Sequence, residues 1–176
     1  PWLNNCLALG AAAGDAGNVV LSPLHLVHSG LLRWLELFPS DHFSAFAAEY
    51  NRLTQLEYER VLDFHWLPFT LSQRNDSAYW RACKAVTLSE QLCHRMELFR
   101  QRGNIASYEQ ETFSSPAWVS LLLANQYWPQ KYDARLNGIN IEQVQRYTSQ
   151  LKSHIQQMIA AMPSQDDYLS AYRSRQ

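Results

Sequence analysis

Long apolar runs are missing from this sequence of 176 residues, and cysteine is scarce. No uninterrupted apolar segment approaches the roughly 20 residues that a membrane-spanning helix needs, and no signal peptide is visible. The three cysteines, Cys6, Cys83 and Cys93, are too few and too scattered for a disulfide framework or a zinc ribbon. We therefore expect a cytoplasmic protein that makes no membrane contact.

Charge is scarce as well. Lys, Arg, Asp and Glu make up 18% of the chain, below the roughly 25% of an average soluble domain, and the formal net charge is −1. This balance gives no electrostatic basis for binding nucleic acid. Aromatic residues reach 12%, so we expect extensive burial, in part against a partner domain. The chain starts at Pro1 and not at Met, and its first segment is typical of the middle of a longer sequence. We therefore expect that Pro1 is not a natural start.

The first 22 residues differ in pattern from the rest. The segment "CLALG", residues 6–10, is a short apolar run that predicts a buried strand leading into a turn. The segment "AAAGDAGN" follows, and its residues are mostly small. We expect another part of the backbone, or a ligand, to pack closely against the backbone of this segment. In doubly wound folds such a junction admits a nucleotide, although the same small residues also serve tight packing.

From Pro23 onward the pattern predicts six or seven helices. Ser22 is a favoured N-cap and Pro23 a favoured first-turn residue. Ser89 and Gly103 are typical of the two ends of one helix, and Ser115 is typical of the start of another. We predict helices over about residues 23–38, 43–67, 90–102, 116–125 and 141–162, with a last turn or two after Ser164. Asn75 or Asp76 is expected to cap a further short helix that carries Tyr79, Trp80 and Cys83. Pro68 is expected to end or kink the second helix.

Apolar spacing predicts which residues line one face of each helix. In the helix after Ser22 these residues are Leu24, Val27, Leu31, Leu35 and Phe38. The helix over 116–125 is apolar nearly all round, so we expect it to be deeply buried.

Histidine and carboxylate pairs are the first candidates for metal chemistry. His25 and His28 are three residues apart on one helix, but no carboxylate lies beside them at helical spacing to complete a metal site. His94 and Glu97 form an H-x-x-E pair without the second copy that a di-iron bundle needs. We therefore expect no metal, with one of the first two histidines packed and hydrogen-bonded and the other exposed.

Two further groups have ordinary structural explanations. The charges at Glu57, Glu59, Arg60 and Asp63 are expected to be solvated pairs on a helix surface. Aromatic residues in the second half of the chain either line a pocket for a planar ligand or pack in the core, which is the more common fate; they are Tyr79, Trp80, Trp118, Tyr127, Trp128 and Tyr132.

Seven segments, in order and nearly from end to end, resemble the C-terminal part of the flavin-dependent tryptophan halogenase family. They are "NCLALGAAAG", "HLVHSGLLRWLELFP", "EYNRLTQLEYERVLDFHWL", "RNDSAYWRACKAVTLSEQL", "ELFRQRGNI", "FSSPAWVSLLLANQYWPQKYDARL" and "IAAMPSQDDYL". The resemblance implies a mainly α fold class: the helical region of an α/β flavin-monooxygenase-like fold, with one short strand and a glycine-rich loop at its N-terminus.

The resemblance also implies two domains and a cofactor. Residues 1–22 would be the strand and loop edge of an FAD-binding domain, and residues 23–176 the helical substrate-side region. The loop that passes the FAD would consist of Gly10, Ala11, Ala12, Ala13 and Gly14. The family's dinucleotide fingerprint, its W-x-W-x-I-P motif and its reactive lysine are absent from this sequence, so we do not expect the chain to catalyse a reaction alone.

The family's halide and glutamate motif, roughly P-L-E-S-T-G, is altered here. An ungapped match places Val20 at the glutamate thought to assist catalysis, so no catalytic residue is assigned. The halide side of the pocket would be Leu21, Ser22 and Pro23. Pro23 has no N–H to donate and Val20 has no carboxylate to take a proton. The resemblance therefore implies a disabled or repurposed halide pocket, with Asp15 as the substitute acid if the match is shifted.

The substrate side departs from the tryptophan-specific members too. Their paired aromatics after the position of Trp118 are replaced here by leucines at 121–123, although Trp118, Tyr127 and Trp128 remain to border a cavity for an aromatic small molecule. The predicted partners are the FAD domain of the same protein and a flavin reductase. Two alternatives stay open: a non-catalytic helical binding or scaffold module derived from this family, and a flavin monooxygenase that hydroxylates.

Overall fold

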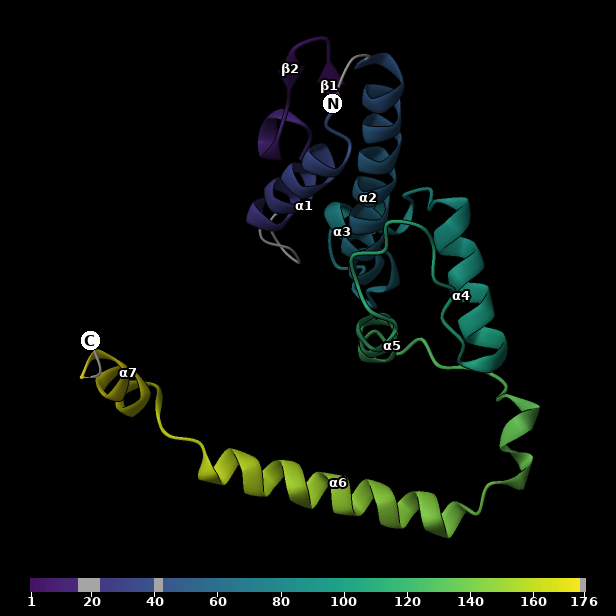
Figure 1. The fold of residues 1–176 in the computed structure, drawn as a ribbon. Helices are drawn as coiled ribbons and strands as arrows, with labels where there is room; N and C mark the ends of the chain where they lie inside the picture. The colour runs from purple at the N-terminus through teal and green to yellow at the C-terminus, as the bar shows by residue number, and fades with distance from the viewer. Residues whose placement is uncertain (16–22, 40–42, 175–176) are drawn as a thin grey trace. The chain divides into compact units, whose positions relative to one another are not determined.

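The computed structural model describes residues 1–15, 23–39 and 43–174, and the chain divides into two compact units, Pro1–Tyr132 and Asp133–Gln176 (Figure 1). The first unit begins with strands β1 (Trp2–Leu3) and β2 (Cys6–Leu7), followed by a short 3-10 helix, η1 (Gly10–Ala12). Its α-helices are α1 (Pro23–Glu36), α2 (Phe43–Leu71), α3 (Ala78–Lys84), α4 (Glu90–Arg102) and α5 (Ser115–Ala124). The second unit contains η2 (Ala134–Gly138), α6 (Ile141–Ala161) and α7 (Gln165–Arg173).

The seven α-helices of the described residues confirm the predicted helix count and the mainly α fold class. The strand prediction was wrong in extent and burial. β2 covers only Cys6–Leu7, pairs antiparallel with β1, and leaves Cys6 exposed. The pairing is a tight hairpin whose turn contains Asn4 in a left-handed conformation, with φ of 50°.

Helix ends follow the local signals closely. The Ser89 hydroxyl accepts a hydrogen bond from the Leu92 N–H at 3.0 Å, and Gly103 ends α4 with φ of 69°. Asn140 and Ser164 cap α6 and α7 as predicted. The cap of α5 is one residue earlier than predicted, because Ser115 is already the first residue of that helix.

Pro68 neither ends nor visibly interrupts α2, which continues to Leu71. Proline removes one helical hydrogen bond and crowds the preceding turn. Phe64 and Leu67 on that turn are buried in the main core, and Leu71 packs against the same cluster. Burial on both sides of the proline therefore holds the helix together where the sequence pattern predicted its end.

The main core lies where α2, α4 and α5 meet. Trp118 and Leu122 of α5 are fully buried, and the Trp118 ring meets Phe64 edge-on with ring centroids 4.7 Å apart. Phe113, just before α5, stacks on Phe64 at 3.8 Å. The expected deep burial of α5 is confirmed for these two residues, while its other apolar side chains are half-buried at the edge of the cluster.

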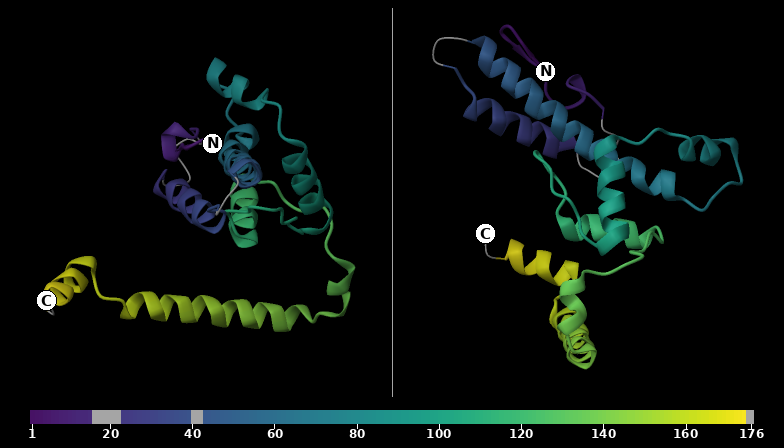
Figure 2. Two further views of the ribbon diagram at one scale, coloured as in Figure 1. Left: turned by 45° about the horizontal axis from the view of Figure 1, so that its top comes forward. Right: turned by 90° about the vertical axis from the view of Figure 1, so that its right-hand side faces the viewer.

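Helix α1 lies along the N-terminal half of α2 (Figure 2) but not with its most apolar face. The buried positions are Leu26, Gly30 and Arg33. Most of the predicted apolar stripe is exposed instead, including Leu24, Leu35 and Phe38. The interface with α2 is built on a glycine contact and a buried ion pair, which apolar spacing alone does not reveal.

Candidate functional site

The glycine loop after β2 is packed tightly on one side. Gly10 has φ of 56°, and a Cβ there would lie 2.9 Å from Val27 of α1. A Cβ on Gly14 would lie 3.1 Å from the ring of Tyr58 in α2, whose hydroxyl donates to the Gly10 carbonyl at 3.2 Å. Both glycines therefore allow a close approach to the helices.

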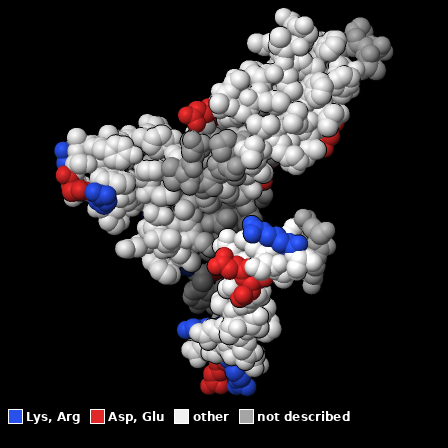
Figure 3. Space-filling view, turned by 90° about the vertical axis from the view of Figure 1, so that its left-hand side faces the viewer, with Lys and Arg blue, Asp and Glu red and all other residues white. Residues whose placement is uncertain are grey.

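The other side of this loop is open. Ala11 and Ala12 of η1 are exposed, and Ala13 is half-exposed. Figure 3 views the molecule from the side on which α1 lies in Figure 1, and the upper right part of this face carries no Lys or Arg and only isolated acidic residues. Residues 10–14 thus offer backbone and methyl groups to whatever lies against them, and the next residue, Asp15, is exposed.

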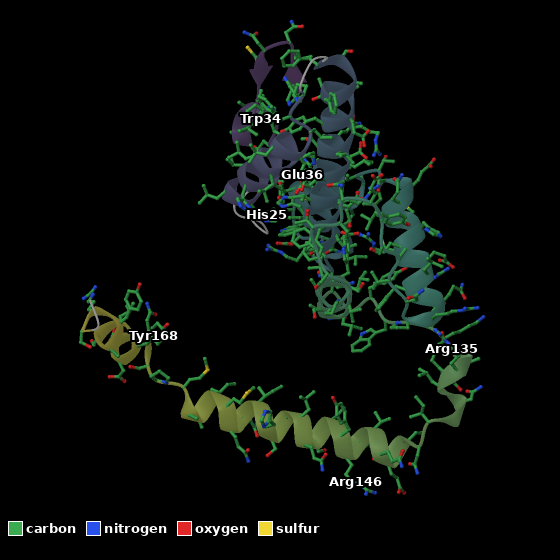
Figure 4. The ribbon with its side chains drawn as sticks, viewed as in Figure 1. His25, Trp34, Glu36, Arg135, Arg146 and Tyr168 are labelled. Carbon is green, nitrogen blue, oxygen red and sulfur yellow. The ribbon has the colours of Figure 1, made fainter. Side chains whose placement is uncertain are left out.

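The residues matched to the family's halide motif lie mostly outside the described part of the chain. Val20, Leu21 and Ser22 are among the residues that the structure does not describe, and Pro23 is the first residue of α1. Two residues later, His25 places Nε2 3.7 Å from Glu57 Oε1 (Figure 4 labels His25). His28 is exposed, and the described residues contain no group of three potential metal ligands. His25 is exposed as well, and its distance to Glu57 is longer than a hydrogen bond, so the expectation that one of the two histidines is packed and hydrogen-bonded was wrong.

A buried polar network joins α1, α2 and the segment before α5. Arg33 donates to Glu57 Oε2, to Thr54 Oγ1 and to Gln110 Oε1, each at 2.9 Å. Ser29 donates to the same Glu57 oxygen at 3.0 Å. Arg33 and Glu57 are both more than nine-tenths buried, so their charges are compensated almost entirely by each other and by these neighbours.

A second buried network lies between α2 and α4. Ser89, the cap of α4, donates to Asp63 Oδ2 at 2.8 Å, and Arg60 lies 3.9 Å from the same oxygen. Burial raises the pKa of Asp63, while the Ser89 hydrogen bond and the positive charge of Arg60 oppose the shift. Deeper in, Arg95 pairs with Glu111, and burial lowers the pKa of its guanidinium.

These networks overturn the expectation of solvated pairs for three of the four charges on α2. Glu57, Arg60 and Asp63 are buried, and only Glu59, which accepts from Gln55 at 2.9 Å, keeps an ordinary surface pair. Arg60 and Asp63 do form the i,i+3 pair that the spacing along α2 predicts, but the pair is buried. The hydrogen-bond partners Arg33 of Glu57 and Ser89 of Asp63 lie on other elements, so the spacing along α2 gave no signal for them.

A cavity of about 390 Å³ opens beside Trp118. Its walls are the side chains and backbone of residues 105–107, 111–115 and 118. The Trp118 indole N–H donates to Glu111 Oε1 at 3.1 Å, and the Arg95 guanidinium lies 3.9 Å from the centre of the Trp118 ring. A carboxylate and several hydroxyls therefore border one space of small-molecule size, beside the fully buried Trp118 ring.

The other predicted aromatic residues do not line this cavity. Tyr127 packs behind it, stacked on Phe99 at 6.4 Å, with its hydroxyl donating to the Met96 carbonyl at 3.4 Å. Trp128, Tyr79 and Tyr132 are exposed in this chain.

One wall residue of the cavity also belongs to the packing between α1 and α2. Phe113 lines the cavity and also packs against the small core cluster of Leu26 and Val61. Leu26 lies in the first turn of α1, three residues after Pro23. Phe113 thus connects the wall of the cavity with the core cluster to which α1 contributes Leu26.

Residues 1–140 match the family model described as tryptophan halogenase. The chain belongs to the tryptophan halogenase family. Tryptophan 7-halogenase KtzQ of Kutzneria sp. (strain 744) is 30% identical over 100 residues, which cover 56% of this chain and 19% of that protein. The family assignment made from the sequence is confirmed.

Solved structures confirm the fold class of this tryptophan halogenase family member. Flavin-dependent halogenases from Brevundimonas sp. BAL3 and from Xanthomonas campestris match with TM-scores of 0.89 and 0.90 and identities of 26% and 29%. Each match covers 97% of this chain and 35% of the solved chain. The chain thus spans about a third of these structures and about a fifth of the curated relative. Among its described helices, none combines the length and apolarity needed to cross a bilayer.

Proposed function

We propose that this chain is the helical, substrate-side region of a flavin-dependent halogenase-like oxidoreductase that acts on an aromatic small molecule. The observation that carries the proposal is the cavity at Trp118, whose wall residue Phe113 packs against the core cluster formed by Leu26 of α1 and Val61 of α2. The family membership and the flavin-dependent halogenase relatives support the same conclusion. In this proposal residues 1–22 form the edge of an FAD-binding domain, residues 23–176 form the substrate side, and a separate flavin reductase supplies reduced flavin.

The loop over residues 10–14 fits a flavin on its open side. Its glycines are needed where the loop meets Val27 and Tyr58, while Ala11 and Ala12 leave the opposite side free of bulk and charge. Small side chains allow a planar cofactor to approach the backbone closely. FAD, when bound, would supply the electrons that activate oxygen, and this loop would position the cofactor at the α1 side of the cavity.

The altered motif argues against the family's ordinary halogenation. By resemblance, the halide is held by backbone N–H groups near Ser22 and Pro23, and proline has none to give. Hydrogen bonds to charged groups contribute about 1.5–3 kcal/mol each, so one missing donor weakens halide binding substantially. Val20 also lacks the carboxylate that would take or orient a proton. Val20 and Pro23 therefore favour two alternative functions, a flavin monooxygenase that hydroxylates and a non-catalytic scaffold.

The test uses the full-length protein that contains this chain. A titration with FAD, followed by flavin fluorescence, establishes whether the protein is a flavoprotein at all. Bromide-dependent product is then measured by mass spectrometry, with a flavin reductase and a panel of indoles, for the unmodified protein and for Val20→Glu combined with Pro23→Gly. We expect bromination only in the double variant.

A matched control is Val19→Glu, which adds the same charge one position away and should gain nothing. Efficient bromination by the unmodified protein would refute the disabled pocket. Oxygenated product without bromide would favour the hydroxylase, and a protein without FAD affinity would leave the scaffold as the conclusion.

A further inference from the structure

The cavity at Trp118 is bordered by two arms of one non-helical segment between α4 and α5. Residues 105–107 form one arm and residues 111–113 form the other, while the joining residues 108–110 do not line the cavity. Arg95 of α4 holds both arms, because its Nε donates to the Ala106 carbonyl at 3.1 Å and its guanidinium pairs with Glu111. The width of the cavity therefore depends on how this segment is held.

Two of the joining residues are held near the surface. The Tyr108 hydroxyl lies 2.6 Å from Nδ1 of His94, an exposed residue of α4. Glu109 accepts hydrogen bonds of 2.9 and 2.8 Å from Arg52 of α2, and both side chains of this ion pair are exposed. Exposed pairs of this kind stabilise a structure only slightly, because the surrounding water screens the charges.

The third joining residue, Gln110, is attached to the interior. Its Oε1 accepts a hydrogen bond of 2.9 Å from Arg33 of α1, which is 7% exposed. A hydrogen bond to a buried charged group is stronger than an exposed one, because water does not replace the lost partner there. The same guanidinium also binds Glu57 and Thr54 of α2, so Gln110 is anchored to the packed interface between α1 and α2.

The backbone of Gln110 is strained. Its φ is 58°, in the left-handed region that residues other than glycine adopt at a cost. Such a conformation persists where surrounding contacts impose it, and it is common beside ligand sites. The next residue, Glu111, belongs to the cavity wall, so the direction of the chain at Gln110 determines where that carboxylate lies.

We propose that Gln110 is a positioning residue for the cavity at Trp118. Its hydrogen bond to Arg33 holds the joining residues in place, and thereby fixes Glu111 on one arm relative to residues 105–107 on the other. A wall that is fixed before the ligand arrives improves affinity, because binding then orders nothing further. This role rests on the proposed function in one respect, namely that the cavity holds an aromatic small molecule.

Calorimetry with free indole on the full-length protein tests this role. Gln110→Gly removes the side chain and also relieves the strain of the positive φ, so we expect little change in the unfolding temperature. We expect the dissociation constant of indole to rise about fivefold, the factor that corresponds to one ordinary hydrogen bond. Gln110→Glu keeps an oxygen within reach of Arg33 and should bind indole nearly as tightly as the unmodified protein.

The chain offers a matched control in Gln126. This glutamine also has a positive φ, of 61°, but it is exposed and does not line the cavity. Gln126→Gly should therefore leave the dissociation constant of indole unchanged, and Glu109→Ala should change it far less than Gln110→Gly does. Unchanged affinity in Gln110→Gly, or an equal loss in Gln126→Gly, would overturn the proposal.

Hydrogen exchange provides a readout that needs no ligand. We expect the amides of residues 105–107 and 112–113 to exchange several-fold faster in Gln110→Gly than in the unmodified protein, and Gln126→Gly to leave them unchanged. Unaltered exchange on both arms would refute the positioning role. If the unmodified protein binds no indole but Gln110→Gly accelerates exchange on both arms, the proposed function fails and the positioning of the wall stands.

Discussion

The Arg33 guanidinium lies 2.9 Å from the Glu57 carboxylate, and this buried contact ties α1 to α2 beside the glycine loop. We predict that Arg33→Met destabilises the protein by about 3–5 kcal/mol, because it leaves a buried carboxylate without its counter-ion. The free energy of unfolding, obtained from urea titration of the full-length protein, measures the change.

Two further variants distinguish the effect of losing the buried ion pair from the effect of removing a large side chain. Removing both charges in Arg33→Met with Glu57→Met should restore much of the lost stability, since a buried pair is often no more stable than an apolar one. Arg52→Met is the control, because Arg52 pairs with Glu49 and Glu109 in exposed positions and should change stability far less. Equal losses in the Arg33 and Arg52 variants would contradict the assignment.

The carboxyl group of Asp63 should make stability depend on pH. Burial raises its pKa above the ordinary 3.8, so the folded state binds the proton more tightly than the unfolded state does. The contribution of Asp63 to the free energy of unfolding therefore falls as pH rises from the pKa of the unfolded state, about 3.9, through the raised pKa of the folded state. Above that range this contribution is constant. The difference in unfolding free energy between the unmodified protein and Asp63→Asn should follow this course. A difference that grows with pH would show the opposite shift.

Local signals in the sequence predicted the helices and most of their ends, because a cap is a contact between neighbours in the chain. Ser89, Gly103 and Asn140 act where they were expected. The resemblance predicted the family and the fold class.

What spacing could not predict was contacts between helices. Arg33 and Gln110 are 77 residues apart, and the buried face of α1 contains Gly30 and Arg33 instead of its leucines. The cavity at Trp118 also depends on a non-helical segment, residues 105–113, to which the sequence pattern assigned no role. Of the three aromatic residues expected to border a cavity, the fold brings Trp118 to this one.

The left-handed end of α4 gives a backbone prediction. Gly103→Ala should destabilise the protein by about 1–2 kcal/mol, because a side chain strains the backbone at φ of 69°. A Cβ there would touch Pro129 only at the ordinary distance of 3.5 Å, so the cost comes from conformation and not from a clash. Gly138→Ala is the matched control, since a Cβ at that position meets nothing within 4 Å. Thermal unfolding of both variants checks the prediction, and a loss at position 138 equal to that at 103 would contradict it.

The indole of Trp118 should matter for both packing and binding. Trp118→Phe keeps an aromatic ring in the core but leaves Glu111 Oε1 without the N–H donor now 3.1 Å away. We expect a loss of about 1–3 kcal/mol in unfolding free energy, typical of a buried acceptor that loses its partner. The variant also changes the cavity wall, so the dissociation constant of free indole, measured by calorimetry on the full-length protein, should rise several-fold. Trp128→Phe, on an exposed residue that does not line the cavity, should leave both quantities unchanged. If indole binds the Trp118 variant as tightly as the unmodified protein, the cavity is not where an aromatic substrate sits.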